Sequence, residues 1–286
     1  MYDDPSGISQ GFLPDQGPRQ DLSQITPSAF KMMSGISSIP SIYNRTSRSL
    51  LSLTQRRLVS PINASSLSPS RLAFSHSQYR TNMSGSAAFF EAVRNRRSVY
   101  TITSETTIPD EKIQEIITEA VKHAPSSFNS QSSRAVLLLG AEHKKLWEIT
   151  LNVLKGIVPA EQLPATEGRI QGFANGHGTV LFFEDETAVT ELQTKFPLYQ
   201  DRFPQWSQHA SGILQYIVWT ALEAEGLGAS LQHYNPLITP QVLSTWDLPS
   251  SWTLVAQLVF GKPSAPAGEK TFQPIEGVRF KTFGKQ

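Results

Sequence analysis

The sequence predicts one α+β domain of about 200 residues, a usual size for a single domain, starting near Ser86. Two segments, 113–124 and 208–225, carry apolar residues at the spacing of a helix face. Three short apolar runs bounded by turn residues are typical of buried strands: 135–140, 179–184 and 253–261. These signals occur in one stretch of chain without an internal repeat, so we expect a single mixed domain over 86–286.

The residues before this domain have a different composition. Between Leu22 and Phe90 there is no Asp or Glu, whereas Ser and Arg recur, as in a mitochondrial transit segment. The opening "MYDDPSG" is too acidic for a presequence, and three internal methionines are alternative initiators: Met32, Met33 and Met83. We expect residues 1–85 to be a disordered extension, either a transit segment or without function. The protein would then be mitochondrial, or cytoplasmic or nuclear, depending on the true start codon.

Composition also excludes several kinds of chemistry. The chain has no Cys, which excludes disulfides, thiolate nucleophiles and Cys-ligated zinc or iron–sulfur sites. No apolar run reaches the roughly 18 residues that a membrane-spanning helix needs, so no membrane insertion is expected. The residues before Ser84 carry 8 basic and 4 acidic side chains, which leaves 17 basic and 20 acidic ones in the remainder. A body with a net charge of −3 is not suited to hold nucleic acid.

The folded part is predicted to open with a short helix in "AAFFEAVRNRRS", which ends in basic residues. The next helix follows Pro109 and an acidic first turn, and its apolar face comprises Ile113, Ile116, Ile117, Ala120, Val121 and Ala124. The third helix, Gln208 to Glu225, has an almost continuous apolar surface and stops at Gly226 and Gly228. We expect this third helix to be long and mostly buried.

The first polar motif, "RNRRSVY" (94–100), lies at the end of the first helix. Arg offers a planar fork of donors that stays charged, and Ser adds a neutral donor. Arg96, Arg97 and Ser98 therefore form a candidate phosphate clamp. The alternative interpretation is a helix C-terminus whose cations offset the helix dipole.

The second motif, "PSSFNSQSSR" (125–134), places hydroxyls and amides directly before the first apolar run. Asn129 and Gln131 supply a donor and an acceptor together, which suits the edge of a heteroaromatic ring. The alternative is a capping and turn segment, because Ser and Asn are common turn residues.

The third motif, "GLGASLQHYNP" (226–236), follows the long helix. Its two glycines permit close approach of the backbone to a ligand, and Gln232 and His233 belong to a dense polar cluster. His233 is either a general acid or a hydrogen-bonded buried histidine.

Taken in this order, the three motifs resemble the FMN-dependent nitroreductase family. Within it, "NRRSVY", "FNSQSSRAV", "GLGASLQHYN" and "LVFG" are similar to the fungal and bacterial branch called fatty-acid repression mutant protein-like. The resemblance runs from Ala87 to the C-terminus. It implies a mixed, mainly antiparallel sheet wrapped by helices, in an intertwined homodimer with two FMN molecules at the subunit interface. The helix over 208–225 would lie in the core of this dimer.

The resemblance also assigns FMN-binding roles by position. The residues expected to hold the phosphate and ribityl chain are Arg96, Arg97 and Ser98. Those expected to face the edge of the flavin ring are Asn129 and Gln131, where hydrogen bonds tune the ring. Those expected to line its other side are Gly228, Gln232 and His233. The basic residue expected to close the phosphate site is Arg279, with Lys281 and Lys262 as alternatives.

The implied activity is a ping-pong reaction in which NADH or NADPH passes hydride to flavin N5 and leaves. A small oxidised aromatic compound, such as a nitroaromatic or a quinone, then takes its place. No catalytic side chain is required, which agrees with the absence of Cys and of a Gly-x-Ser-x-Gly motif. The alternative is a flavin-binding regulatory protein in lipid or oxidative-stress signalling with only incidental turnover.

Two features depart from the family pattern or are open to more than one interpretation. Many nitroreductases have a Lys where this chain has Tyr100, so the negative charge of the reduced flavin must be stabilised elsewhere, by Arg97 or His233. The aromatic-rich stretch 196–206 is either a lid that stacks aromatic acceptors over the flavin or a packed connection.

Overall fold

A computed structural model describes residues 85–284, so residues 1–84 of the predicted extension lie outside the described residues. The helices are α2 (Ala87–Asn95), α3 (Asp110–His123), α4 (Gly140–Lys155), α5 (Leu163–Ala174), α6 (Glu186–Lys195), α7 (Phe203–Ala224) and α8 (Thr239–Thr245). The strands are β1 (Ile102–Thr103), β2 (Ser133–Leu139), β3 (Gly178–Asp185), β4 (Gly228–Gln232) and β5 (Trp252–Pro263). Short 3₁₀ turns lie at η2 (Ser127–Asn129), η3 (Ala160–Gln162) and η4 (Pro197–Tyr199).

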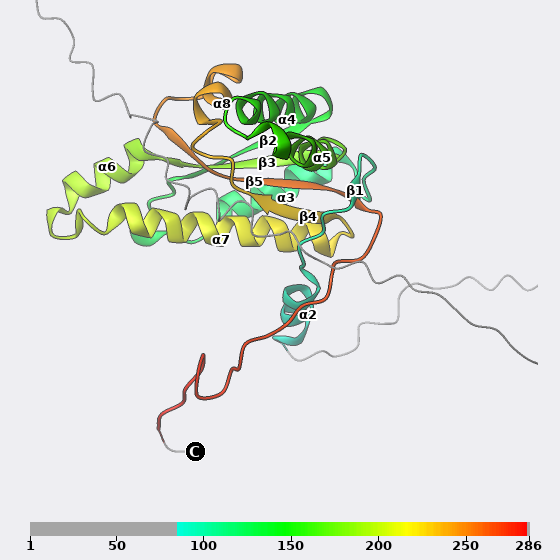
Figure 1. Cartoon of the computed structure of the whole chain (residues 1–286). Helices are drawn as coiled ribbons and strands as arrows, with labels where there is room; N and C mark the ends of the chain where they lie inside the picture. The colour runs from blue at the N-terminus through cyan, green and yellow to red at the C-terminus, as the bar shows by residue number, and fades with distance from the viewer. Residues whose placement is uncertain (1–84, 285–286) are drawn as a thin grey trace, which may run out of the picture. The chain divides into compact units, whose positions relative to one another are not determined.

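The five strands form one sheet in which every paired strand is antiparallel. The order is β1-β5-β3-β2, and β4 pairs with β5. Helices α3 and α7 lie on one face, and α4, α5 and α8 lie on the other (Figure 1). A single parallel bridge between Ser98 and Ala229 adds the segment after α2 to this arrangement. The predicted α+β fold, with a mainly antiparallel sheet wrapped by helices, is confirmed.

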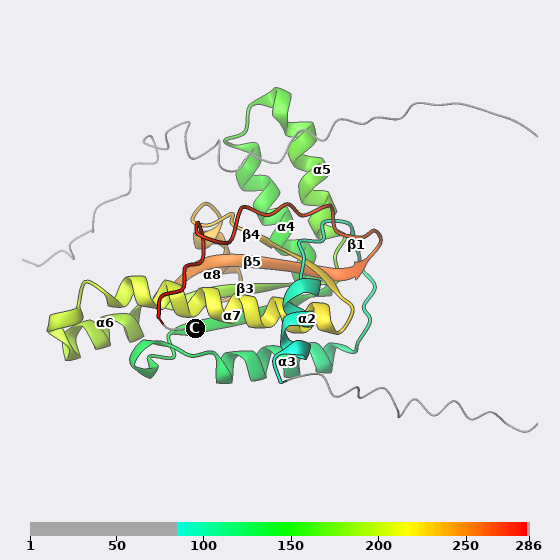
Figure 2. The same ribbon diagram turned by 90° about the horizontal axis from the view of Figure 1, so that it is seen from below.

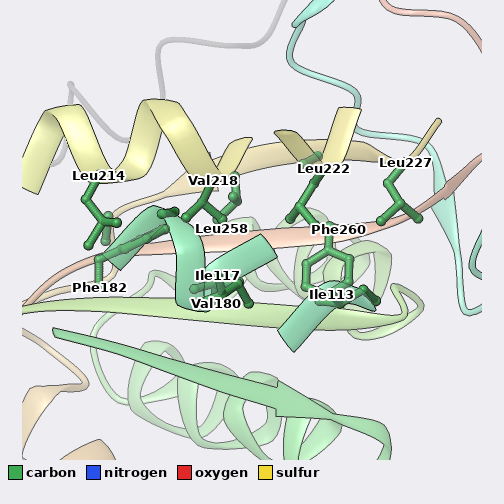
Figure 3. Close-up of a cluster of buried hydrophobic side chains, with 13 residues drawn as sticks. Ile113, Ile117, Val180, Phe182, Leu214, Val218, Leu222, Leu227, Leu258 and Phe260 are labelled. Atoms are coloured by element: carbon green, nitrogen blue, oxygen red, sulfur yellow. The ribbon is translucent and has the colours of Figure 1, made fainter. Parts of the chain in front are cut away.

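The core lies between the sheet and the helix pair α3 and α7. Successive residues of a strand point to opposite faces, so Val180 and Phe182 of β3 face these helices. Leu214, Val218 and Leu222 of α7 pack against this face with other fully or almost fully buried side chains (Figure 3): Ile113, Ile117, Leu227, Leu258 and Phe260. Each such side chain contributes about 1.5–3 kcal/mol by leaving water. All residues of β3 from 178 to 184 are buried, which confirms the predicted buried strand.

The structure differs from the expected elements at three places. α7 begins at Phe203 rather than at 208, because Pro204 lies in its first turn, where proline is tolerated. α2 ends at Asn95, and Arg96 is already extended. Residues 228–232, read only as a polar cluster after glycines, form a strand on the edge of β5. Gly226 ends α7 with a φ of +85°, as the predicted stop signal requires.

The chain after β5 forms an exposed C-terminal tail, residues 264–284, which runs past α2 and away from the sheet (Figure 1). Its exposed large apolar side chains are Phe272, Ile275, Val278, Phe280 and Phe283. The rest of the described chain therefore leaves these five large apolar side chains uncovered.

Within residues 85–284, no helix is both long and apolar enough to cross a membrane.

Candidate functional site

The first and third motifs lie side by side. The N–H of Val99 donates to the carbonyl oxygen of Ala229 at 2.9 Å, directly beside the bridge from Ser98 to the same residue. A Cβ atom on Gly228 would lie 2.8 Å from Cγ1 of Val99, closer than real carbon atoms approach. Gly228 therefore lets the segment Arg96–Ser98 pack against the start of β4.

The two arginines of the first motif are held from α7. The N–H of Arg97 donates to Oε2 of Glu223 at 2.6 Å, and Nε1–H of Trp219 donates to Oε1 of the same carboxylate at 2.8 Å. The guanidinium of Arg96 stacks over Trp219, 4.4 Å from the ring centroid. Burial raises the pKa of Glu223, and its hydrogen bonds from Arg97 and Trp219 act in the opposite direction. Sequence reasoning missed both residues of α7.

The alternative interpretation of this motif, cations at a helix C-terminus, applies to Arg94 in the last turn of α2. Arg96 and Arg97 lie beyond the helix, in extended chain, and both are partly buried. Nη2 of Arg97 donates to the carbonyl oxygen of Gly268 in the C-terminal tail. The pair is thus part of a defined local structure and does not belong to a frayed helix end.

Gln232 and His233 lie at the far end of β4. The amide of Gln232 donates to Oγ of Ser230 at 3.1 Å. The next residues are fixed by the buried amide of Gln257 on β5, which accepts from the N–H of Tyr234 at 2.8 Å. His233 is exposed, so it is not the buried histidine of the alternative interpretation. Although the residue as a whole is exposed, the part of its ring that lies against the protein is desolvated, and this lowers the pKa of His233 and favours a neutral imidazole over a cation.

The second motif forms a strained loop over 126–131. Three of its residues, none of them glycine, have positive φ: Phe128 at 56°, Asn129 at 52° and Gln131 at 49°. This conformation costs an L-residue about 1–2 kcal/mol, so the surrounding contacts must hold it. Oγ of Ser126 accepts from the N–H of Gln131 at 2.9 Å, and Nη1 of Arg134 donates to the carbonyl oxygen of Gln131. The side chains of Asn129 and Gln131 are exposed.

The end of this loop is anchored on a buried carboxylate. Glu184 at the end of β3 is 2% exposed, and its two oxygens accept hydrogen bonds from the hydroxyls of Ser132 and Ser133. Burial raises the pKa of Glu184, and these hydrogen bonds act against that rise. Arg134 forms an ion pair with Asp185 at 2.9 Å. The sequence analysis did not identify this anchor, although Glu184 stands out in the sequence as a carboxylate at the end of the apolar run "LFFE".

The front of the loop is held by an aromatic cluster. The ring of Phe128 lies 4.8 to 6.0 Å, between centroids, from four other rings: Phe196, Tyr199, Phe203 and Trp206. The segment 196–206 is therefore packed against the loop that carries Asn129 and Gln131. Phe128 remains 50% exposed.

Substitution of Phe128 tests the strained conformation. We expect Phe128→Gly to be more stable than Phe128→Ala by about 1 kcal/mol, since only glycine adopts a positive φ without cost. In a right-handed helix interior the order of Gly and Ala is reversed. Urea unfolding of both variants measures the difference, and a more stable Ala variant would show that the loop does not keep this conformation.

The structure brings together only part of the predicted set. Arg97 contacts Glu223 near the end of α7, whereas Phe128 contacts Trp206 near its start. These two α7 residues are 17 positions apart, which corresponds to about 26 Å along a helix. Figure 2 shows α2 and α6 toward opposite ends of α7. Within one chain, the Arg96–Ser98 segment and the Asn129–Gln131 loop therefore form two separate half-sites.

Gln232 and His233 are also distant from that loop. Gln232 pairs with Gln257, which pairs with Leu181, which pairs with Val136 of β2. Three strand spacings, about 14 Å, separate β4 from β2, and the loop lies beyond the start of β2. Gln232 and His233 thus lie apart from the Asn129–Gln131 loop, at the other end of the strand that begins at Gly228.

The C-terminal basic candidates differ in their surroundings. Arg279 and Lys281 are exposed residues of the C-terminal tail. Figure 1 shows that this tail runs away from the sheet. Lys262 forms an ion pair with Glu105 at 2.6 Å, and Lys262 lowers the pKa of that carboxyl group. Tyr100 is 50% exposed.

A surface hollow of about 550 Å³ lies elsewhere, along α6. Its lining includes Glu186, Glu191 and Lys195 with several threonines, and none of the predicted site residues. Two carboxylates beside one ammonium group do not suit an anionic phosphate. The hollow therefore has no part in the candidate site.

Comparison with known proteins agrees with the motifs. The model of the nitroreductase family matches residues 93–262. The Saccharomyces cerevisiae protein HBN1 is 41% identical over 194 residues, and nitroreductase FRM2 of the same yeast is 35% identical over 197; each match covers 66% of this chain and 95% of the relative. The structure of nitroreductase CinD from Lactococcus lactis in complex with chloramphenicol is 45% identical, with a TM-score of 0.63, covering 68% of this chain and 100% of CinD. The chain therefore belongs to the nitroreductase family, in the branch that its motifs predicted.

Proposed function

We propose that the protein is an FMN-dependent oxidoreductase that acts as a homodimer and uses NADH or NADPH to reduce nitroaromatic compounds, quinones or related oxidised molecules. The observation that carries this proposal is the separation of the two half-sites along α7. Each half-site carries groups that suit a different part of FMN, and a second copy of the chain supplies the missing half of each.

The residues present fit the cofactor. Arg96, Arg97 and Ser98 offer two cations and a hydroxyl for a phosphate, and their segment is fixed by α7 and β4. The exposed amides of Asn129 and Gln131 offer donors and acceptors to the edge of a ring. Neutral His233 and the amide of Gln232 would contact the ring as hydrogen-bonding groups.

A homodimer accounts for the surfaces that one chain leaves uncovered. In a two-fold dimer the same patch of both chains meets itself, and two α7 helices pair in opposite directions when the two-fold axis is perpendicular to them. The end of one α7 then lies near the start of the other. Ile213 on α7, 40% exposed, and the apolar side chains of the C-terminal tail would be covered by the partner. The tail would also carry Arg279 toward the partner's phosphate group.

When bound, FMN supplies the hydride-transfer chemistry between the nicotinamide and the acceptor. The chain binds and orients the cofactor, and Arg97 contributes positive charge near the first half-site. The neutral form of His233 makes Arg97 the better candidate to stabilise negative charge. CinD has been solved in complex with chloramphenicol and with 4-nitrophenol, both nitroaromatic compounds, which supports this class of acceptor.

An absorbance spectrum of the purified full chain tests the proposal. We expect flavin bands near about 370 and 450 nm, after addition of FMN if necessary, that bleach when NADPH or NADH is added without oxygen. A nitroaromatic compound should then restore the bands rapidly. A colourless protein that does not bind added FMN would contradict the proposal. Slow oxidation with every acceptor would favour the regulatory flavin-binding alternative.

A further inference from the structure

Glu223 places a negative charge beside the segment that is proposed to bind a phosphate. Its carboxylate accepts from the N–H of Arg97 at 2.6 Å and from Nε1–H of Trp219 at 2.8 Å. A carboxylate near a phosphate lowers the affinity for that phosphate by repulsion. Its position would be explained by a favourable contribution to binding that exceeds this repulsion.

The hydrogen bonds of Glu223 leave both guanidinium charges available. Glu223 bonds to the main-chain N–H of Arg97 and to an indole N–H, so it does not pair with either guanidinium group. Within the described residues, neither Arg96 nor Arg97 forms an ion pair with a carboxylate. The guanidinium of Arg96 instead rests on Trp219, the same ring that Glu223 holds. Glu223 thus fixes the geometry of the segment without an ion pair to either guanidinium group, although its charge and that of Arg96 attract each other over a longer distance.

We propose that Glu223 is a positioning residue for the phosphate of FMN. It fixes the backbone of segment 96–98 directly and the guanidinium of Arg96 through Trp219. Both arginines are ordered before the ligand arrives, so the conformational entropy of their side chains and backbone is not lost on binding. This inference rests on the proposed function and adds a residue that acts through others and does not touch the ligand.

The proposal and the simple electrostatic expectation predict opposite changes in FMN affinity when Glu223 is replaced. If Glu223 only repels the phosphate, its removal tightens FMN binding. If it positions the arginines, Glu223→Ala weakens FMN binding by about tenfold, the effect of losing one hydrogen bond to a charged group. Glu223→Gln keeps one oxygen, which can accept from the N–H of Arg97, while its NH2 group then faces Nε1–H of Trp219 and cannot accept from it. With one of the two hydrogen bonds kept, Glu223→Gln should bind FMN more tightly than Glu223→Ala. Since both variants remove the charge, the difference between them reports position alone.

The experiment measures dissociation constants for FMN and for riboflavin by quenching of flavin fluorescence, in the full-length wild type and three variants. Riboflavin lacks the phosphate, so Glu223→Ala should change its affinity by less than about twofold while FMN affinity falls about tenfold. Glu225→Ala is the matched control, because Glu225 is an exposed carboxylate at the same helix end. It should leave FMN binding unchanged or slightly tighter.

The outcomes separate the two proposals. A wild-type protein that does not bind FMN would overturn the proposed function, and this inference with it. Normal binding by the wild type with equal or tighter FMN binding by Glu223→Ala would overturn the inference alone. Equal losses for FMN and riboflavin would also overturn it, because they would indicate a general structural defect. If Glu223→Ala does not fold, Glu223→Met takes its place, because it removes both acceptor oxygens but fills a similar space, and the same riboflavin criterion applies.

Discussion

Two variants that are each inactive should restore activity when they are produced together in one cell. Arg97→Ala removes a cation from one half-site, and Asn129→Gly removes an amide from the other. Glycine is chosen at 129 because the backbone there has a φ of 52°, which glycine adopts without strain. In a dimer with shared sites, each homodimer has two damaged sites, whereas each mixed dimer has one intact site and one doubly damaged site.

Random assembly makes half of the dimers mixed, so about a quarter of all sites should be intact. The measurement is bound flavin and turnover of a nitroaromatic compound in the co-purified mixture, relative to the wild type. The control is co-production of Arg97→Ala with Ser98→Ala, which damages the same half-site and should restore nothing. No recovery in the first mixture, with normal assembly of mixed dimers, would contradict a shared site.

The sequence predicted the elements whose signals are long or strongly periodic. The apolar face of α3 and the apolar runs of β3 and β5 could be recognised in the sequence. A helix that buries one face needs apolar residues at regular spacing, and a strand buried on both faces needs a continuous apolar run. β4 had no such signal, since "GASLQ" contains no β-branched residue. It forms a strand because β5 offers it an edge. That edge is a property of the assembled sheet and cannot be found in five residues.

The motifs of the candidate site were visible in the sequence, but the residues that support them were not. Glu223 bonds to a residue 126 positions away, and Glu184 bonds to one 52 positions away. In the sequence Glu223 is an ordinary helix residue. Its neighbours in the chain do not show whether its carboxylate is exposed to water or bonded to the main chain of a distant segment. The separation of the half-sites was hidden for a similar reason. The order of the motifs along the chain does not show which motif lies at which end of α7.

Stability against acid should depend strongly on one histidine that lies outside the candidate site. His143 on α4 is 1% exposed, and its Nδ1 lies 2.9 Å from Oγ1 of Thr179 on β3. Nε1–H of Trp147 donates to the same hydroxyl oxygen at 3.2 Å, so the hydroxyl hydrogen remains for Nδ1. Nδ1 then acts as an acceptor, as in a neutral imidazole. Among the described residues Nε2 makes no hydrogen bond of normal geometry, although the carbonyl groups of Ala174 and Phe173 are close enough to act on the pKa of the ring.

Burial lowers the pKa of His143 to about 4, although the carbonyl groups of Ala174 and Phe173 act in the opposite direction. In the unfolded chain the pKa is near the ordinary value of 6.5. Between these values the unfolded state binds a proton that the folded state does not bind. The free energy of unfolding should therefore fall as the pH falls from about 6.5 to about 4. The total loss from this one group is about 3 kcal/mol.

The variant His143→Asn isolates this contribution. The Asn side chain does not titrate, and its oxygen keeps an acceptor for the hydroxyl of Thr179. We expect His143→Asn to be less stable than the wild type at pH 7, because it leaves a small cavity. Its free energy of unfolding should change less between pH 7 and pH 4 than that of the wild type.

Glu184 and Glu223 have raised pKa values, which make the folded state more stable as the pH falls, but they are common to both proteins and cancel in the difference. Urea unfolding at one fixed protein concentration measures both curves. Parallel curves over this range would show that the folded protein binds the same proton as the unfolded chain, and that His143 is not held neutral.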